Sequence, residues 1–159
     1  MRSGGAEANR GGAEIFKPDG ASGCQGGGMN TTRKDTNIWP GITCDDPLAE
    51  REWLRGIGFE DGILVEGDGD GEVVHSEMLW PDGGRVMVSS ICKVDTTFTN
   101  PPGTSGVYVV VTDPDAVYAR AQAIGARLVR DMAEEDYGSR GFSIADAEGN
   151  TWSFGTYAG

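Results

Sequence analysis

The chain has 159 residues, close to the size of one domain with a tail, and its 25 acidic residues outnumber 13 lysines and arginines. The formal net charge of −12 repels phosphate groups, which argues against nucleic acid and anionic membrane surfaces as partners. The sequence contains no run of 18 apolar residues, as a transmembrane helix would require. Three widely separated cysteines predict free thiols and a cytoplasmic location. They are Cys24, Cys44 and Cys92.

Residues 1–36 are rich in glycine, alanine and polar side chains, with Ile15 and Phe16 as the only apolar pair. Such a segment buries too little apolar surface to offset the entropy lost on ordering. We therefore expect a disordered tail at 1–36 and a domain at 37–159. The tail holds five basic and four acidic residues, so the expected domain carries a net charge of −13.

The domain begins with a short predicted strand at 37–44, and Pro40 within it favours an edge or bulged strand. A helix is predicted next, because Asp46 can cap it, Pro47 suits its first turn and Gly58 can end it. We expect three apolar side chains to form its buried face. They are Leu48, Trp53 and Leu54.

Three strands follow the helix, and the same order of elements then recurs. The glycine-rich turn at 81–84 is a strong hairpin signal between the second and third of these strands. The predicted strands of the first half are 63–67, 72–80 and 85–90. The second half has a strand at 106–113, a helix at 114–124 and strands at 127–132, 141–147 and 150–157.

The two halves align as a repeat with an offset of 67 residues. Asp-Pro at the helix start and Ile-Gly at the helix end match at this offset, and the later hairpin glycines match at 66. The matched positions are Asp46 and Asp113, Pro47 and Pro114, Ile57 and Ile124, Gly58 and Gly125, and Gly83 and Gly149. Each βαβββ module, at about 37–92 and 105–158, predicts a four-stranded sheet with one helix on its outer face. The fold class is therefore α+β, with paired sheets around a concave cleft.

This arrangement resembles the vicinal oxygen chelate superfamily, which includes glyoxalases, extradiol dioxygenases and bleomycin-resistance proteins. The resemblance covers about 37–157 and is most specific at 112–157, TDPDAVYARAQAIGARLVRDMAEEDYGSRGFSIADAEGNTWSFGTY. It implies a homodimer whose clefts are completed between chains.

The metal enzymes of that superfamily carry one His, Gln or Glu on the first and last strand of each module. Alignment by the Asp-Pro and Asp-x-x-Gly landmarks assigns these places to Trp39, to Met87 or Val88, to Val107 and to Ser153. Indole, thioether and isopropyl groups cannot replace carboxylate, imidazole or thiolate ligands. We therefore expect no metal cofactor and no catalytic residues of the superfamily's type. The same register turns Ser153 to the cleft and makes Trp152 and Phe154 core residues.

His75 is the only histidine, and strand alternation places it on one face with Glu77. The pair has two interpretations. It is either a half-buried pair on a sheet with no third partner, or an acid and base of a lyase or isomerase with a rearranged or weak metal site.

The leading interpretation is a metal-free protein that binds a small molecule, such as a cationic antibiotic or metabolite. Trp39 is the expected stacking platform, and Glu77 the expected counter-charge. Tyr137 and Arg140 belong to a loop that borders the cleft in similar proteins, although Arg140 could equally pair with its acidic neighbours. The predicted ligand-binding residues are Trp39, His75, Glu77, Met87, Tyr137 and Arg140. A structural or regulatory module with a filled cleft is a third possibility.

Overall fold

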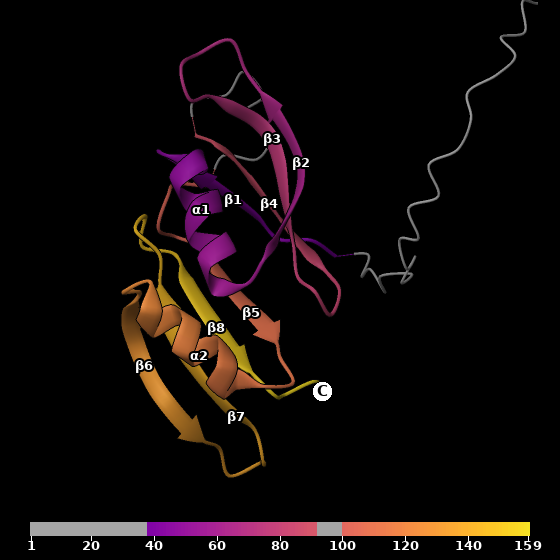
Figure 1. The fold of residues 1–159 in the computed structure, drawn as a ribbon, viewed down its shortest axis with the longest axis vertical. Coiled ribbons are helices and arrows are strands. Elements are labelled where there is room, and N and C mark those ends of the chain that lie inside the picture. The colour runs from indigo at the N-terminus through magenta and orange to yellow at the C-terminus, as the bar shows by residue number, and fades with distance from the viewer. Residues whose placement is uncertain (1–37, 92–99) are drawn as a thin grey trace, which may run out of the picture. The chain divides into compact units, whose positions relative to one another are not determined.

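Two four-stranded mixed sheets, each with a helix across one face, make up the residues that the computed structural model describes, 38–91 and 100–159 (Figure 1). Their strand orders are β1-β4-β3-β2 and β5-β8-β7-β6. In both sheets the first strand of the module pairs in parallel with the last, and the other pairs are antiparallel. The predicted α+β fold class with paired βαβββ modules is confirmed.

The elements follow the predicted order in both modules. The N-terminal module comprises β1 (Gly41–Cys44), α1 (Pro47–Ile57), β2 (Glu60–Glu66), β3 (Val73–Leu79) and β4 (Arg85–Ser90). The C-terminal module comprises β5 (Gly106–Val110), α2 (Pro114–Ala123), β6 (Arg127–Glu134), β7 (Arg140–Ala145) and β8 (Thr151–Gly155). As Pro40 indicated, β1 lies at the edge of its sheet and begins just after this proline.

The repeat has a physical basis at the helix starts and the hairpins. Asp46 accepts a hydrogen bond from the Ala49 backbone N–H, and Asp113 accepts the equivalent bond from Ala116, both at 3.0 Å. These aspartates satisfy backbone donors that have no partner within the helix. Gly83 and Gly149 both have positive φ angles, 120° and 99°, which glycine adopts without steric cost.

The buried face of α1 differs from the prediction. Leu54 is buried as expected, but Leu48 is 36% exposed, whereas Glu50 and Arg51 are almost fully buried. Arg51 is stabilised there because it donates to the Glu77 backbone carbonyl at 3.1 Å and to Asp61 at 2.7 Å. The apolar residues alone therefore did not identify the buried face of α1, because this face also contains two charged residues.

Aromatic rings join the cores of the two modules. Phe59 lies 4.9 Å from Trp80 in its own module and 5.8 Å from Trp152 of the other, measured between ring centroids. Trp53 also contacts Trp152, and Trp80 contacts Phe154. Trp152 and Phe154 are fully buried, which confirms the predicted register of β8.

A buried carboxyl pair also links the modules. Glu50 on α1, only 2% exposed, lies beside Asp146, which follows β7. The Asp146 carboxylate accepts from the backbone N–H groups of Gly149 and Asn150, from the Asn150 amide and from the Trp152 indole. Burial, and then the neighbouring Asp146, raise the pKa of Glu50 to about 9. Glu50 is therefore neutral at pH 7.

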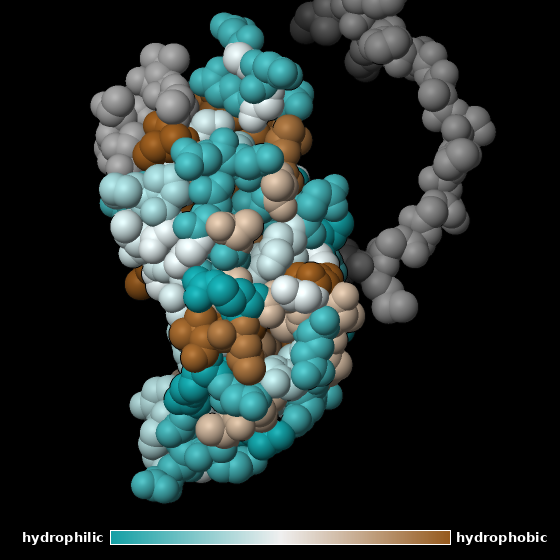
Figure 2. All heavy atoms as spheres, turned by 90° about the vertical axis from the view of Figure 1, so that its left-hand side faces the viewer, coloured by the Kyte–Doolittle hydropathy of each residue, from teal (hydrophilic) through white to brown (hydrophobic). Residues whose placement is uncertain are grey.

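The predicted tail at 1–36 lies outside the described residues. Within 38–91 and 100–159, no helix has the length and apolar character needed to cross a membrane. The face in Figure 2 is mainly polar, and its apolar residues form small separate groups.

Candidate functional site

Four of the predicted ligand-binding residues come together on the face of the first sheet that points away from α1. His75 and Glu77 lie on this face of β3, because the alternate residues Ser76 and Met78 are fully buried. Met87 on β4 pairs with Glu77 on one side and with Gly41 on the other. Trp39 precedes Gly41 by two residues, which places its ring at the same face.

Arg85 connects these side chains. Its guanidinium lies 4.4 Å from the centroid of the Trp39 ring, and its Nη1 donates to Glu77 Oε2 at 2.6 Å. The other oxygen of Glu77 lies 3.4 Å from His75 Nε2. The result is a line of contacts across the sheet, from Trp39 through Arg85 and Glu77 to His75.

The line is partly open to solvent. Trp39 is 40% exposed, whereas the side chains of Arg85 and Glu77 are 23% and 16% exposed. A cation–π contact and an ion pair are stronger at such partly desolvated positions than on an open surface. These contacts therefore hold the Glu77 carboxylate in a defined place.

The prediction that the His75–Glu77 pair has no third partner is wrong, since Arg85 is that partner. A cation of the chain, Arg85, contacts both Trp39 and Glu77, the two residues expected to receive a cationic ligand. Alternation along β4 contained the signal, since Arg85 is two residues before Met87 and must share its face.

A groove of about 540 Å³ adjoins this face and has Arg85 in its wall. Apolar side chains of both modules line most of it. They include Ile38, Pro40, Phe59, Trp80, Val107 and Val110. Its volume falls in the range of small-molecule sites, which combine apolar walls with a few polar groups.

A larger depression of about 820 Å³ lies between α1 and β2. Its charged groups are engaged with one another, since Arg51 and Arg55 both bind the Asp61 carboxylate at 2.7–3.0 Å. These arginines lower the pKa of Asp61, mainly through the hydrogen bonds from Arg55. The arginines of this depression are therefore already engaged with a carboxylate of the chain.

Tyr137 belongs to a group of tyrosines on the C-terminal module. Its ring contacts Tyr157 edge to face with centroids 5.5 Å apart, and the Tyr157 backbone N–H donates to the Tyr108 hydroxyl at 3.1 Å. Tyr108 pairs with Ser153 across β5 and β8, on the face away from α2. The sequence indicated Tyr137 but not its association with Tyr108 and Tyr157, which depends on how the C-terminal residues return over β5.

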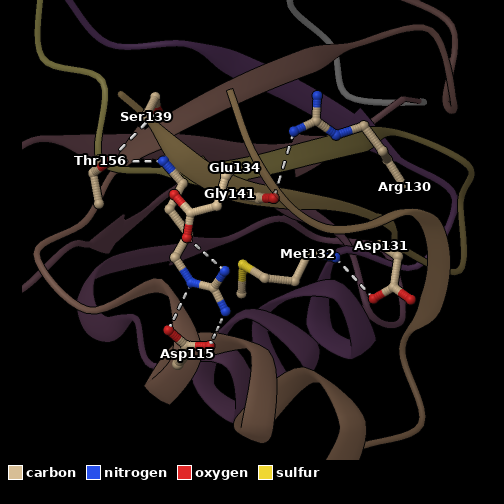
Figure 3. A network of polar contacts seen from close by, with 9 residues as sticks. Asp115, Arg130, Asp131, Met132, Glu134, Ser139, Gly141 and Thr156 are labelled. Atoms are coloured by element: carbon tan, nitrogen blue, oxygen red, sulfur yellow. Dashed lines mark hydrogen bonds and ion pairs between the residues drawn. The ribbon is translucent and has the colours of Figure 1, made fainter. Parts of the chain in front are cut away.

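Arg140 is directed to the other face of its sheet. It donates two hydrogen bonds to Asp115 in the first turn of α2, at 2.7 and 2.9 Å, and one to Glu134 at 2.8 Å. Figure 3 shows this network, with Asp115 on the helix and Glu134 on the strand. The Arg140 hydrogen bonds lower the pKa of Asp115. The structure therefore does not bring Arg140 together with the four residues around Arg85.

Solved structures with the same arrangement establish what this fold is. No family model and no curated protein matches the sequence. TioX from Micromonospora sp. ML1 superimposes with a TM-score of 0.65 and 26% identity, covering 77% of this chain and 99% of its own. A second structure is a glyoxalase/bleomycin resistance protein/dioxygenase superfamily member from Sphaerobacter thermophilus DSM 20745. It superimposes with a TM-score of 0.58 and 16% identity, covering 75% of this chain and 96% of its own. The chain has the glyoxalase/bleomycin-resistance fold.

The bleomycin resistance determinant encoded on transposon Tn5 has this glyoxalase/bleomycin-resistance fold as well. It gives a TM-score of 0.55 at 10% identity and covers 75% of this chain and 95% of its own. The resemblance inferred from the sequence is thus confirmed at the level of the fold.

The superfamily's metal places can now be compared with the structure. The assignment of Val107 is wrong, because Val107 pairs with the core residue Trp152, whereas Tyr108 pairs with the cleft-facing Ser153. In the first module the assignment of Trp39 is also wrong, because the residue of β1 that pairs with the cleft-facing Met87 is Gly41. Val88 is buried in the core.

The four cleft-facing positions do not fit a divalent metal. They supply no side chain at Gly41, a thioether at Met87 and hydroxyls at Tyr108 and Ser153. Within the described ranges, no group of three or more His, Cys, Asp or Glu residues is arranged to hold a metal ion.

Proposed function

We propose that this protein binds a small, cationic, partly planar molecule in the groove beside Arg85. The observation that carries the proposal is an apolar groove of about 540 Å³ with Arg85 in its wall, where the Arg85 guanidinium contacts the Trp39 ring and the Glu77 carboxylate. The net charge of −13 on residues 37–159 favours the approach of cations. The fold is shared with a protein named for bleomycin resistance, which supports sequestration of an antibiotic or metabolite as the biological role.

Calorimetric titration of the protein with a panel of cationic and anionic planar compounds tests this proposal. We expect cations to bind more tightly than anions of similar size, and their affinity to fall as salt concentration rises. Trp39→Ala should weaken cation binding by about fivefold, because an aromatic–cation contact contributes on the order of 1 kcal/mol. Val129→Ala, on β6, is the matched control and should leave binding unchanged. Tighter binding of the anions would refute the proposal.

The contact between His75 and Glu77 favours a second candidate, a lyase or isomerase. A carboxylate held by Arg85 can orient the imidazole, as a general base requires. Incubation of the protein with a metabolite extract, followed by mass spectrometry, tests this candidate. Conversion that disappears in His75→Gln would support the enzyme. Conversion that persists in the variant would refute His75 as its base.

We also propose that the protein acts as a cytoplasmic homodimer. The strand β5 lies at the edge of its sheet and exposes Tyr108 and Val110, and such edges are commonly covered by another chain. In that dimer, Tyr137 would contribute to the cleft from the C-terminal module, whereas Arg140 would act through its contact with α2. Sedimentation at micromolar concentration should show a dimer, and a strictly monomeric protein would contradict the proposal.

A further inference from the structure

Arg85 occupies a site that has the composition of a guanidinium receptor. The Trp39 ring lies against the guanidinium at 4.4 Å, and the Glu77 carboxylate accepts one of its N–H groups at 2.6 Å. A flat aromatic face and a carboxylate are the two partners that a planar, forked cation uses best. The chain itself therefore reveals which kind of cation the site accommodates.

The carboxylate does not depend on Arg85 alone for its position. Glu77 lies on the central strand β3 and is only 16% exposed, and its other oxygen is in contact with His75 at 3.4 Å. Met87 pairs with Glu77 from β4 and lies beside it on the same face. The receptor would thus keep its shape if the guanidinium moved away.

Arg85 lies beside the hairpin turn that joins β3 to β4. It is the first residue of β4 and follows Gly83 and Gly84, which both have positive φ angles in the hairpin turn. Its side chain is partly exposed and forms part of the wall of the groove. A molecule in the groove therefore lies next to the guanidinium and can compete with it for Trp39 and Glu77.

We propose that Arg85 is a built-in ligand of this site, and that small molecules with a guanidinium or amidinium group bind by displacing it. The proposal rests on the proposed function, because it names the chemical class that the cation site selects. The displaced Arg85 moves to solvent, while the ligand's cationic group stacks on Trp39 and pairs with Glu77. The apolar part of the ligand occupies the groove.

Removal of the Arg85 side chain tests this assignment, with ethylguanidinium as the probe. Arg85→Ala and the more conservative Arg85→Gln should both bind the probe at least tenfold more tightly than the unchanged protein, as measured by tryptophan fluorescence and calorimetry. Ethylammonium should bind these variants more weakly than ethylguanidinium, since it cannot stack as a plane. Adding Glu77→Gln or Trp39→Ala to the Arg85→Ala variant should abolish the gain. Equal affinity for ethylguanidinium in the unchanged protein and in both single variants would overturn the proposal.

A second measurement uses the unchanged protein and separates this proposal from the proposed function. High concentrations of ethylguanidinium should shift the NMR signal of the Arg85 Nε–H group, because the guanidinium leaves the indole ring. An unshifted signal at saturation would overturn displacement, even if cations bind elsewhere in the groove. Conversely, if no compound of the cationic panel binds the unchanged protein but Arg85→Ala binds ethylguanidinium, the proposed function fails and the receptor assignment stands.

Discussion

The periodicity of apolar residues did not predict that Glu50 is buried. It occupies an inward position of α1, yet a glutamate at that place in the sequence suggests solvent exposure. The structure buries it against Asp146, a residue 96 positions away in the chain, and this raises its pKa to about 9. Burial with such a partner is a tertiary event, which local sequence does not encode.

Stability should therefore depend on pH through Glu50. Its pKa is about 4.5 as an unperturbed group and about 9 in the folded protein, so the folded state binds the extra proton between these values. This contribution to the free energy of unfolding is complete below pH 4.5 and is lost as pH rises toward 9, by up to about 1.4 kcal/mol per pH unit.

The Glu50→Gln variant should lose this dependence, because glutamine stays neutral at every pH. Urea unfolding at pH 5 and pH 8 should show a smaller fall in stability for the variant than for the unchanged protein. Glu52→Gln, on the same helix but 73% exposed, is the control and should behave as the unchanged protein. An identical fall in all three proteins would contradict the assignment.

The candidate site could be predicted in part at the level of residues. Strand alternation was sufficient to bring His75 and Glu77 together, and the repeat brought Met87 to the same face. Arg85 was not predicted, although alternation along β4 places it on the Met87 face, because its contact with Glu77 depends on the register between β3 and β4 and on the side-chain conformation. Arg140 lies on the α2 side, since alternation from the buried Phe142 directs it there. This argument was available from the sequence once β7 was placed.

At the scale of elements, capping and turn chemistry predicted the helices and hairpins nearly to the residue. Asp46 caps the start of α1 and Asp113 caps the start of α2. The turn before β4 contains two glycines with positive φ angles. The irregular pairing of β2 with β3, and of β6 with β7, was not predictable, because a bulge depends on both strands at once.

The strand β7 tolerates no side chain at Gly141. A Cβ atom there would lie 2.6 Å from the Phe154 backbone carbonyl oxygen on β8, which cannot move without disturbing the sheet. Gly141→Ala should therefore destabilise the protein by about 1–3 kcal/mol. Gly106→Ala, on β5, is the control, since nothing lies within 4 Å of the added atom. Thermal melting should show a clear decrease for the first variant and little change for the second.

At the scale of the described domain, the two modules behave as one unit because they share a core. Phe59 touches Trp80 within its own module and Trp152 in the other. The sequence predicted the repeat, but not that these particular rings meet, since contacts between modules depend on how the sheets pack.

Phe59→Ala should weaken both modules together. Loss of a buried phenyl ring costs about 3–5 kcal/mol, and here the cavity borders residues of both modules. Chemical unfolding followed by near-UV and far-UV circular dichroism should show a single transition at lower denaturant. Tyr137→Ala, which removes an exposed ring, should shift it by less than about 0.5 kcal/mol. Two separate transitions in the Phe59 variant would show that the modules unfold independently.

The placement of the four tryptophans gives the molecule two optical signals. Trp53, Trp80 and Trp152 belong to the joined aromatic core, whereas Trp39 stands apart over Arg85 and is 40% exposed. Acrylamide should therefore quench Trp39 first, and a ligand that stacks on its ring should protect it. The emission that resists the quencher comes mainly from the core. Ligand binding should consequently change the emission of Trp39, which acrylamide can quench. Separation of the modules should change the emission of the core tryptophans, which resists the quencher.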